Sequence, residues 1–385
     1  MTVFWIPKEL AKPSSRSLSP MVTLADLQAV VGDDVRLGVT DCAPFPEVAQ
    51  TIEARVSEGL NGGLGFTYAA PDVATRPLVS FPWGRSIVVA AVPYLVDGDG
   101  DDPRRSVARF ADGDRYGNVR ETLALMEGVL VDEGHRVEQV FDDDRLVDRA
   151  VAVRAGVAWS GKSTMALTPG HGPWFLIGSV VTDAVLAPSK PMVRTCGSCT
   201  ACLPACPTGA IIAPGVLDAS RCLAAVLQRP GSIPIELRES VGHRIYGCDD
   251  CLVACPPGDQ ALVPLSVGSL SVASSSFGGG RLDPASVLAM TDDELNGIAS
   301  HWYVPKRNMR FVRRNALIAA GNAASERDVA LLCGYLGHPD PLLRGHAAWA
   351  LGRSDSEIGH AALVAARRRE RDPDVCGEIS AVLAP

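Results

Sequence analysis

The sequence predicts a chain of three parts: an α/β domain, a cysteine-rich metal-binding domain, and a C-terminal domain of α-helical repeats. Strand-like and helical apolar runs alternate over residues 21–185, eight of the eleven cysteines fall within residues 196–255, and one twelve-residue segment recurs near the C-terminus. With 385 residues and a mean hydropathy of +0.13, the chain is long and apolar enough to bury several cores.

The first part follows a Pro/Ser-rich stretch, residues 1–20, which we expect to be a flexible arm. Ser86–Leu95 and Trp174–Thr182 are short apolar runs of the kind found in buried strands. Between them, apolar side chains recur at helical spacing at Val119, Leu123, Met126 and Leu130. This mixture of strands and helices predicts an α/β domain over residues 21–185.

The cysteines of the second part, residues 186–265, form two motifs. The first, C-x2-C-x2-C-x3-C-P, begins at Cys196, the second, C-x2-C-x3-C-P, begins at Cys248, and Cys222 lies between them. In bacterial ferredoxins, three cysteines of such a run bind one [4Fe–4S] cluster and the fourth binds the other. This rule predicts two ligand sets: Cys196, Cys199, Cys202 and Cys255 for one cluster, and Cys206, Cys222, Cys248 and Cys251 for the other.

A pair of zinc sites is the alternative, because zinc sites also use C-x2-C pairs. The x2-x2-x3 spacing with its terminal proline is rarer in zinc sites and favours a bacterial-ferredoxin-like double [4Fe–4S] domain. This part has too little apolar surface to fold without its metal. The isolated cysteines, Cys42, Cys333 and Cys376, are expected to be buried thiols.

The third part follows a Ser/Gly-rich linker, residues 266–281. Phe311–Asn322 (FVRRNALIAAGN) recurs as Leu342–Arg353 (LLRGHAAWALGR), and a weaker third copy starts at Asp372. Copies 31 or 32 residues apart predict paired helices that stack as HEAT-like repeats over residues 282–385.

The N-terminus lacks the 7–15-residue apolar segment of a signal peptide, and no run reaches the roughly 18 apolar residues of a membrane span. We therefore expect a cytoplasmic protein with no membrane partner, in a compartment where cysteine clusters bind metals. The net charge of −8 argues against a generally basic nucleic-acid binder. Residues 301–385 carry twelve Lys/Arg against nine Asp/Glu, however, so a polyanion can bind there.

Gly156–Ser163 (GVAWSGKS) satisfies the P-loop pattern of nucleotide-binding proteins. A P-loop must follow a buried strand, whereas Leu146–Ala155 carries charges at helical spacing. We therefore expect no nucleotide site there.

Several segments together resemble one enzyme family over nearly the whole chain. They are Arg149–Lys162 (RAVAVRAGVAWSGK), the first cysteine run (CGSCTACLPACPTGAI), Ile233–Cys255 (IPIELRESVGHRIYGCDDCLVAC) and the two repeat segments. In this order they resemble epoxyqueuosine reductase, the cobalamin- and iron–sulfur-dependent enzyme that completes queuosine in tRNA. The resemblance implies an oxidoreductase that reduces epoxyqueuosine to queuosine in tRNA with cobalamin and two [4Fe–4S] clusters.

The resemblance also implies a base-off corrinoid between the α/β domain and the clusters, an external low-potential electron donor, and a helical tail that helps to hold tRNA. We expect a monomer. The acid that protonates the substrate oxygen maps to Asp142, within a run of three aspartates whose crowding raises a carboxyl pKa; the alternative is an exposed acidic turn. The implied corrin contacts are Asp142 itself, Ala166, Leu167, Thr168, Ile177, Cys248 and Asp249.

Several positions depart from the family pattern. Asp143-Asp144-Arg145 replaces Ser-Ala-Pro, Leu227-Gln228-Arg229 replaces Thr-Ile-Glu, Pro257-Gly258 replaces Trp-Asn, and Gly117 replaces a histidine. Two other functions therefore stay open: a corrinoid and iron–sulfur reductase of a small molecule, and an electron-transfer ferredoxin fused to an interaction scaffold. The basic stretch Lys306–Arg314 (KRNMRFVRR) is the expected contact for a phosphate backbone.

Overall fold

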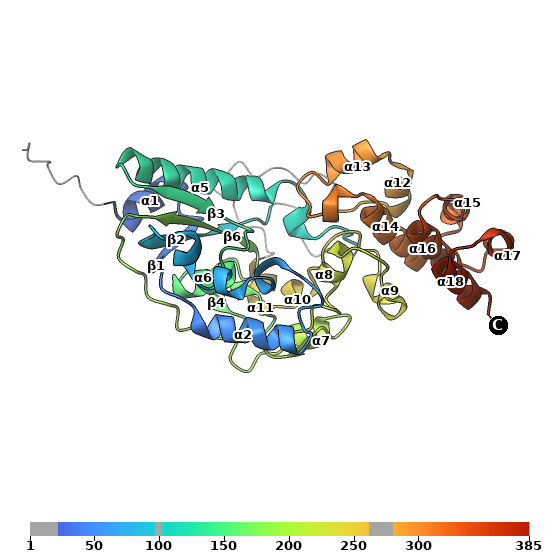
Figure 1. Cartoon of the computed structure of the whole chain (residues 1–385), viewed down its shortest axis with the longest axis horizontal. Helices are drawn as coiled ribbons and strands as arrows, with labels where there is room; N and C mark the ends of the chain where they lie inside the picture. Colours follow the sequence, from blue (N-terminus) through green and yellow to red (C-terminus); the bar gives the residue numbers. More distant parts are fainter. Residues whose placement is uncertain (1–21, 97–101, 103, 262–279, 385) are drawn as a thin grey trace, which may run out of the picture.

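A computed structural model describes residues 22–96, 102, 104–261 and 280–384. The predicted arm at residues 1–20 and nearly all of the predicted linker lie outside this range. The described chain is elongated, with an α/β part at one end, the cysteine-rich part in the middle and helical repeats at the C-terminal end (Figure 1). The active-site residues discussed below come from all three parts.

The α/β part is built on a four-stranded antiparallel sheet of order β1-β2-β6-β3. Its strands are β1 (Arg36–Asp41), β2 (Ser86–Pro93), β6 (Phe175–Thr182) and β3 (Val137–Val140). The two strands predicted from apolar runs, β2 and β6, are paired at the centre of the sheet over eight residues each. Helices cover both faces, which explains why nearly every residue of β2 is buried.

One face of the sheet is covered by α1 (Leu24–Val31) and α5 (Arg115–Asp132). The predicted stripe Val119, Leu123, Met126 and Leu130 is fully buried there. Gly178 of β6 allows close contact, because a Cβ at this position would lie 2.7 Å from a methyl carbon of Val119.

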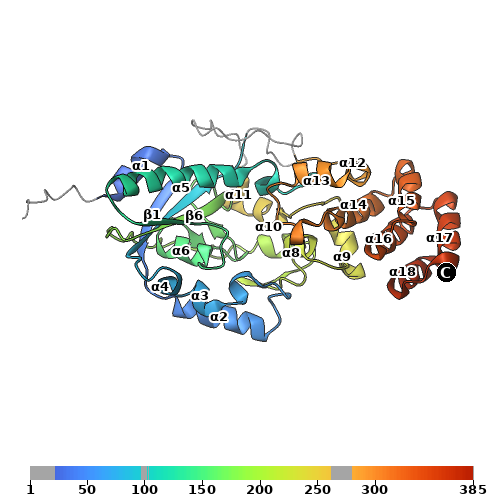
Figure 2. The ribbon, with the colours of Figure 1, turned by 45° about the horizontal axis from the view of Figure 1, so that its top comes forward.

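The other face packs against α6 (Asp148–Arg154). The helices α2 (Pro46–Ser57), α3 (Pro71–Ala74) and α4 (Pro77–Ser80) lie on this side, opposite α1 and α5 (Figure 2). Arg55 of α2 donates a hydrogen bond to the carbonyl of Gly215, so this layer also contacts the cysteine-rich part.

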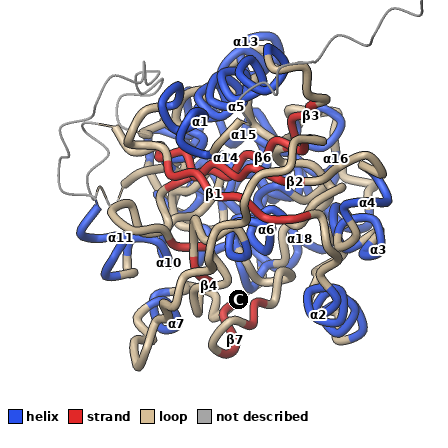
Figure 3. Tube along the Cα trace, turned by 90° about the vertical axis from the view of Figure 1, so that its left-hand side faces the viewer, coloured by secondary structure: helices blue, strands red, loops and turns tan. Residues whose placement is uncertain are grey.

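The cysteine-rich part consists of short elements joined by loops. They are α7 (Cys202–Ala205), β7 (Ile211–Ala213), β8 (Val216–Leu217), α8 (Leu223–Gln228), α9 (Ile235–Val241), α10 (Asp250–Val253) and α11 (Pro256–Ala261). Seen from the α/β end, α7 and β7 lie on the same side of the sheet as α2 (Figure 3). The hairpin of β4 (Trp159–Ser160) and β5 (Ala166–Leu167) also lies on this side.

The helical part begins with α12 (Pro284–Ala289) and α13 (Asp292–Ile298). The three predicted repeat copies become α14 (Arg310–Ala323), α16 (Pro341–Leu351) and α18 (Pro373–Leu383), which stack in that order (Figure 1). The second helices of the pairs are α15 (Val329–Tyr335) and α17 (Glu357–Arg369). The predicted HEAT-like architecture is confirmed.

One hydrophobic core extends from the cysteine-rich part into the helical part. It joins Leu223, Leu237 and Tyr246 to Leu317 and Trp349. Within the described ranges, no helix is both long enough and apolar enough to cross a bilayer.

Candidate active site

Asp142 lies two residues after the end of β3. Its φ is +49°, in the left-handed region that non-glycine residues rarely adopt. Burial raises the pKa of its carboxyl, and the charge of Asp143 raises it further. The residue nevertheless keeps solvent-exposed surface, so its carboxyl is crowded by protein on one side and open on another. An acid that donates a proton to a bound molecule needs both a raised pKa and a side that the molecule can reach.

Aromatic contacts connect Asp142 to the other two parts of the molecule. Tyr116 on α5 lies near Phe141, with 6.4 Å between ring centroids. The pKa of Tyr116 and that of Tyr246 are raised by burial and also by the charge of Asp142. Tyr246, from the cysteine-rich part, stacks on Trp302 of the helical part with 4.5 Å between centroids and 14° between planes. The acid therefore sits where the three parts meet.

Sequence reasoning missed a second acid, Asp148, at the start of α6. Burial raises the pKa of its carboxyl to about 8, and the charge of Asp142 contributes to the shift. Its Oδ1 atom is buried and has no hydrogen-bond partner in the described part of the chain. The spacing of charges in this segment predicted a helix, but only its packing against the sheet shows which charge is buried.

The seven cysteines of the two motifs and Cys222 fall into two groups. The pKa of Cys255 is raised first by burial and also by the charges of its group, Cys196, Cys199 and Cys202. The pKa of Cys251 is raised in the same way, by burial and then by Cys248, Cys222 and Cys206. Because such coupling weakens with distance, these causes support the division predicted from ferredoxin spacing, which stays a prediction.

Hydrogen bonds from the backbone reach sulfur atoms of both groups. The N–H of Lys162 donates to Cys196 Sγ at 3.4 Å, and the N–H of Ala210 donates to Cys206 Sγ at 3.2 Å. The N–H of Gly258 lies where it lowers the pKa of Cys255, partly offsetting burial. Hydrogen bonds to cluster sulfurs tune reduction potentials, so these donors are suited to cluster binding.

Lys162, from the P-loop-like sequence, supports the first cysteine loop. Its Nζ donates to the carbonyls of Gly197 at 2.7 Å and Cys199 at 2.8 Å. Helix α6 precedes this segment and β4 lies within it, which is the reverse of the strand-to-helix order of a P-loop. The expectation of no nucleotide site agrees with this structure.

The residues expected to contact a corrin lie in different places. Ala166 and Leu167 are buried in β5, which pairs only with β4 among the described strands. Both backbone groups of Thr168 bond to Gly172, and its hydroxyl donates to the carbonyl of Val157 at 2.8 Å. Ile177 is half-buried on β6.

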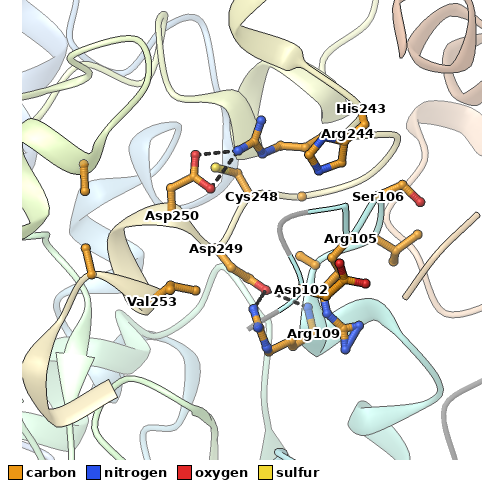
Figure 4. Close-up of a pocket in the computed structure, with 15 residues that line it drawn as sticks. Asp102, Arg105, Ser106, Arg109, His243, Arg244, Cys248, Asp249, Asp250 and Val253 are labelled. Atoms are coloured by element: carbon orange, nitrogen blue, oxygen red, sulfur yellow. Dashed lines mark hydrogen bonds and ion pairs between the residues drawn. The ribbon is translucent and has the colours of Figure 1, made fainter. Parts of the chain in front are cut away.

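Cys248 and Asp249 line a cavity of about 370 Å³ between the α/β and cysteine-rich parts (Figure 4). Asp249 accepts hydrogen bonds from the backbone N–H of Arg109 at 2.9 Å and from its guanidinium at 3.1 Å. Arg244 binds Asp250 through both carboxylate oxygens, at 2.7 and 2.6 Å. Thr168 lines a separate cavity of about 500 Å³.

The basic stretch Lys306–Arg314 is not one phosphate-binding face, so that prediction was wrong in part. Arg314 is fully buried and donates to the carbonyls of Leu227, Arg229 and Gly231. Arg313 is paired with Asp292 and has only 13% of its side chain exposed. Both arginines lie on α14 and connect it to neighbouring segments: Arg314 to the cysteine-rich part and Arg313 to Asp292. Lys306 and Arg307 remain exposed, next to Tyr303.

Residues at the positions that depart from the family pattern form contacts within the chain. Arg145 pairs with Asp143 at 2.7 Å and with Glu138, so the altered tripeptide forms its own ion pairs. The carbonyl of Gly258 accepts a hydrogen bond from Trp174, and a Cβ at Gly258 would lie 2.3 Å from the carbonyl oxygen of Leu252.

Arg229, in the second altered tripeptide, donates to the carbonyls of Gly62 and Ser220. The backbone N–H of Gly117, where the family has a histidine, donates to Asp114 at 2.9 Å and so caps α5. These residues have structural partners in this chain, so the altered positions are accounted for by packing.

Two family models match the chain. The 4Fe-4S double cluster binding domain matches residues 195–258, and HEAT repeats match residues 310–384. Nowhere in the described ranges do three His, Cys, Asp or Glu side chains converge as they would around one metal ion. The match to the cluster family sets the zinc alternative aside.

Known proteins resemble the chain over almost its whole length. Epoxyqueuosine reductase of Bacillus cereus is 30% identical over 369 residues, which cover 90% of this chain and 92% of that protein. A crystal structure of epoxyqueuosine reductase with an epoxyqueuosine-modified tRNA-Tyr stem loop has a TM-score of 0.80 at 28% identity, covering 94% of this chain and 96% of that one.

A structure of the Bacillus subtilis enzyme, in which the loop with the catalytic aspartate is swung out of the active site, also has a TM-score of 0.80. Its identity to this chain is 28%, and the match covers 93% of this chain and 97% of that one. The identity, the coverage, the cluster domain and the repeats agree, and the chain therefore belongs to the epoxyqueuosine reductases, a family of oxidoreductases.

Proposed function

We propose that this protein reduces epoxyqueuosine to queuosine in tRNA, with Asp142 as the acid that protonates the departing oxygen. The placement of Asp142 carries the proposal: it is an open carboxyl of raised pKa at the junction of the three parts, beside Tyr116 and Tyr246. Relatives named epoxyqueuosine reductase, one of them crystallised with a modified tRNA stem loop, support this substrate.

The two cysteine groups would hold the clusters. Burial raises the pKa of Cys248 to about 12, so its thiolate needs a compensating positive charge, which bound iron supplies. Clusters bound there would supply one-electron transfer from an external low-potential donor toward the active site.

Cobalamin would lie between the α/β part and the clusters. When bound, it supplies a metal centre of low potential that exchanges electrons with the substrate. We propose β5 as the strand beside an amide-rich corrin, because β5 pairs only with β4 among the described strands. Cys248 and Asp249 would contact it from the cluster side, and Ile177 from the sheet.

The tRNA contact would include Tyr303, Lys306 and Arg307. Tyr303 is 66% exposed and follows Trp302, which belongs to the aromatic junction near Asp142. An exposed aromatic ring beside two cations suits a nucleotide that enters the site, since bases stack and phosphates pair with cations. A tRNA substrate supports a cytoplasmic location, where we expect the protein to act as a monomer.

We propose five segments for the chain: an N-terminal arm (1–20), a cobalamin-binding α/β domain (21–185), a double-cluster domain (186–265), a linker (266–281) and a HEAT-like domain (282–385). One hydrophobic core joins the double-cluster domain and the HEAT-like domain, from Leu223 to Trp349.

A small-molecule substrate is the weaker candidate. The departures that favoured it, at Asp143–Arg145 and at Gly258, form internal contacts. A scaffold ferredoxin would leave the acid of raised pKa at Asp142 without a role.

The test is turnover in vitro. Protein reconstituted anaerobically with iron, sulfide and cobalamin is incubated with a chemical reductant and epoxyqueuosine-containing tRNA, and the digested nucleosides are measured by mass spectrometry. We expect epoxyqueuosine to lose one oxygen atom and become queuosine. Unchanged epoxyqueuosine, with both clusters and cobalamin bound, contradicts the proposal.

A further inference from the structure

Removal of the epoxide oxygen consumes more than one proton. In the proposed reaction the two C–O bonds of the epoxide break, a C=C bond forms, and the oxygen leaves as water. The balance is one epoxide, two electrons and two protons to one alkene and one water, with the electrons coming from the donor through the clusters. Asp142 carries one proton, so a second must reach the site within each turnover.

Asp148 is the group placed to supply that second proton. The backbone N–H of Asp142 lies close enough to the Asp148 carboxyl to lower its pKa, whereas the charge of Asp142 raises it. The Oδ1 atom of Asp148 is buried and without a hydrogen-bond partner in the part of the chain that the structure describes. A buried oxygen of this kind is costly for an ionised carboxylate and is tolerated by a neutral acid.

The other groups that act on this acid support the neutral form. Burial is the main cause that raises the pKa of Asp148 to about 8; Asp142 and Asp143 raise it too, and Arg149 lowers it. Asp148 in turn contributes to the raised pKa of Tyr116 across the site. At neutral pH the site thus holds a proton on a half-buried carboxyl with one fully buried oxygen.

We propose that Asp148 is a proton relay that acts through Asp142. Asp142 gives its proton to the epoxide oxygen as the first C–O bond breaks, Asp148 reprotonates the Asp142 carboxylate, and Asp142 gives the second proton as the oxygen leaves as water. Asp148 then regains a proton from solvent. This inference rests on the proposed function.

The test compares Asp148→Asn with Asp144→Asn, an exposed acid of the same loop. Asparagine keeps the size and the oxygen acceptor but carries no acidic proton. We expect Asp148→Asn to lower kcat by roughly 10²-fold, at the lower end of what a positioned proton donor contributes, with KM for tRNA unchanged. Wild type and Asp144→Asn should both lose activity as pH rises through about 8, because the relay acid ionises, and Asp148→Asn should lack this decline.

A second measurement needs no substrate, and its first readout uses the wild-type protein alone. In the infrared spectrum of the purified wild-type protein, a protonated carboxyl band should disappear as pH rises through about 8. That band should be missing from Asp148→Asn and present in Asp144→Asn.

An alkaline decline that persists in Asp148→Asn, or the absence of the band in wild type, overturns the relay. Failure of the proposed function is recognised separately, because wild type itself would then leave epoxyqueuosine in tRNA unchanged.

Discussion

At the scale of single residues, the proposed chemistry depends on how burial changes the pKa values of neighbouring acids. Asp142, Asp143 and Asp148 lie within seven positions, yet their environments differ. The Arg145 guanidinium lowers the pKa of Asp143, whereas burial raises the pKa of Asp142 and of Asp148. Pairs of acids whose pKa values are pushed apart in this way are typical of acid–base sites.

Asp142→Asn tests the role of the proposed acid. The amide has nearly the same shape but no acidic proton, so turnover of epoxyqueuosine tRNA should fall by roughly 10²–10⁴-fold. Cluster and corrinoid spectra should be unchanged, because Asp142 belongs to neither cysteine group. Rates come from single-turnover assays analysed by mass spectrometry. A variant with near-normal turnover would remove the acid from this position.

The position of Asp142 could be predicted only by resemblance, and Asp148 could not be predicted at all. A run of three aspartates shows crowding but not which carboxyl faces a partner. Asp143 turned out to be neutralised by Arg145, two residues later. The Oδ1 atom of Asp148 is buried by the fold around α6, and no local sequence pattern predicts this burial.

At the scale of elements, apolar periodicity predicted the strands and helices that are buried against the sheet core. Strands β2 and β6 are buried along most of their length, and helix α5 is buried along one stripe. Their apolar residues therefore follow the spacing of the buried positions. The hairpin β4–β5 escaped prediction because its strands have two residues each, too few for any period. The prediction of a phosphate-binding face at Lys306–Arg314 was wrong in part because a charged side chain in a helix can be buried, as Arg314 is.

Arg314→Met tests the structural role of α14. Methionine fills similar volume but leaves the carbonyls of Leu227, Arg229 and Gly231 without this donor, at a cost of about 1–3 kcal/mol for each group that stays buried. Urea unfolding under anaerobic conditions should show a clear loss of stability. Arg310→Met is the matched control, because Arg310 is 40% exposed and its ion pair with Asp340 is worth at most about 1 kcal/mol. Equal losses in the two variants would contradict the assignment.

Lys306→Ala tests the exposed rim that we assign to tRNA. Each phosphate contact releases counterions, so its loss should reduce the slope of log affinity against log salt by roughly 0.7–0.9. Filter binding over a range of salt concentrations gives the slope. Arg368→Ala is the control, since this cation is exposed on α17, far from the site (Figure 1). Identical slopes for wild type and Lys306→Ala would place the phosphate contacts elsewhere.

At the scale of the whole molecule, the active site exists only because three parts meet. Tyr116 comes from the α/β part, Tyr246 from the cluster part, and Trp302 from the helical part. The parallel bridge between Val107 and Tyr246 and the shared core fix this meeting. Loss of either cluster should therefore disturb the site as well as the electron path.

Metal content tests the division of the cysteines. Anaerobically purified protein should contain about eight iron atoms, as two cubanes. Cys196→Ala and Cys206→Ala, from different groups, should each lose about half of the iron and one cluster signal in electron paramagnetic resonance. Cys376→Ala should keep all of it, because this thiol lies in neither group. Zinc in place of iron, or a full loss from Cys376→Ala, would contradict the pairing.

The most direct test of the central claim is the tRNA of cells whose own epoxyqueuosine reductase has been deleted. Expression of this chain in such cells, followed by mass spectrometry of tRNA nucleosides, shows whether the modification is completed. We predict that queuosine replaces epoxyqueuosine with the wild-type chain, and that epoxyqueuosine persists with Asp142→Asn. Persistent epoxyqueuosine with a wild-type chain that carries both clusters and cobalamin would contradict the account.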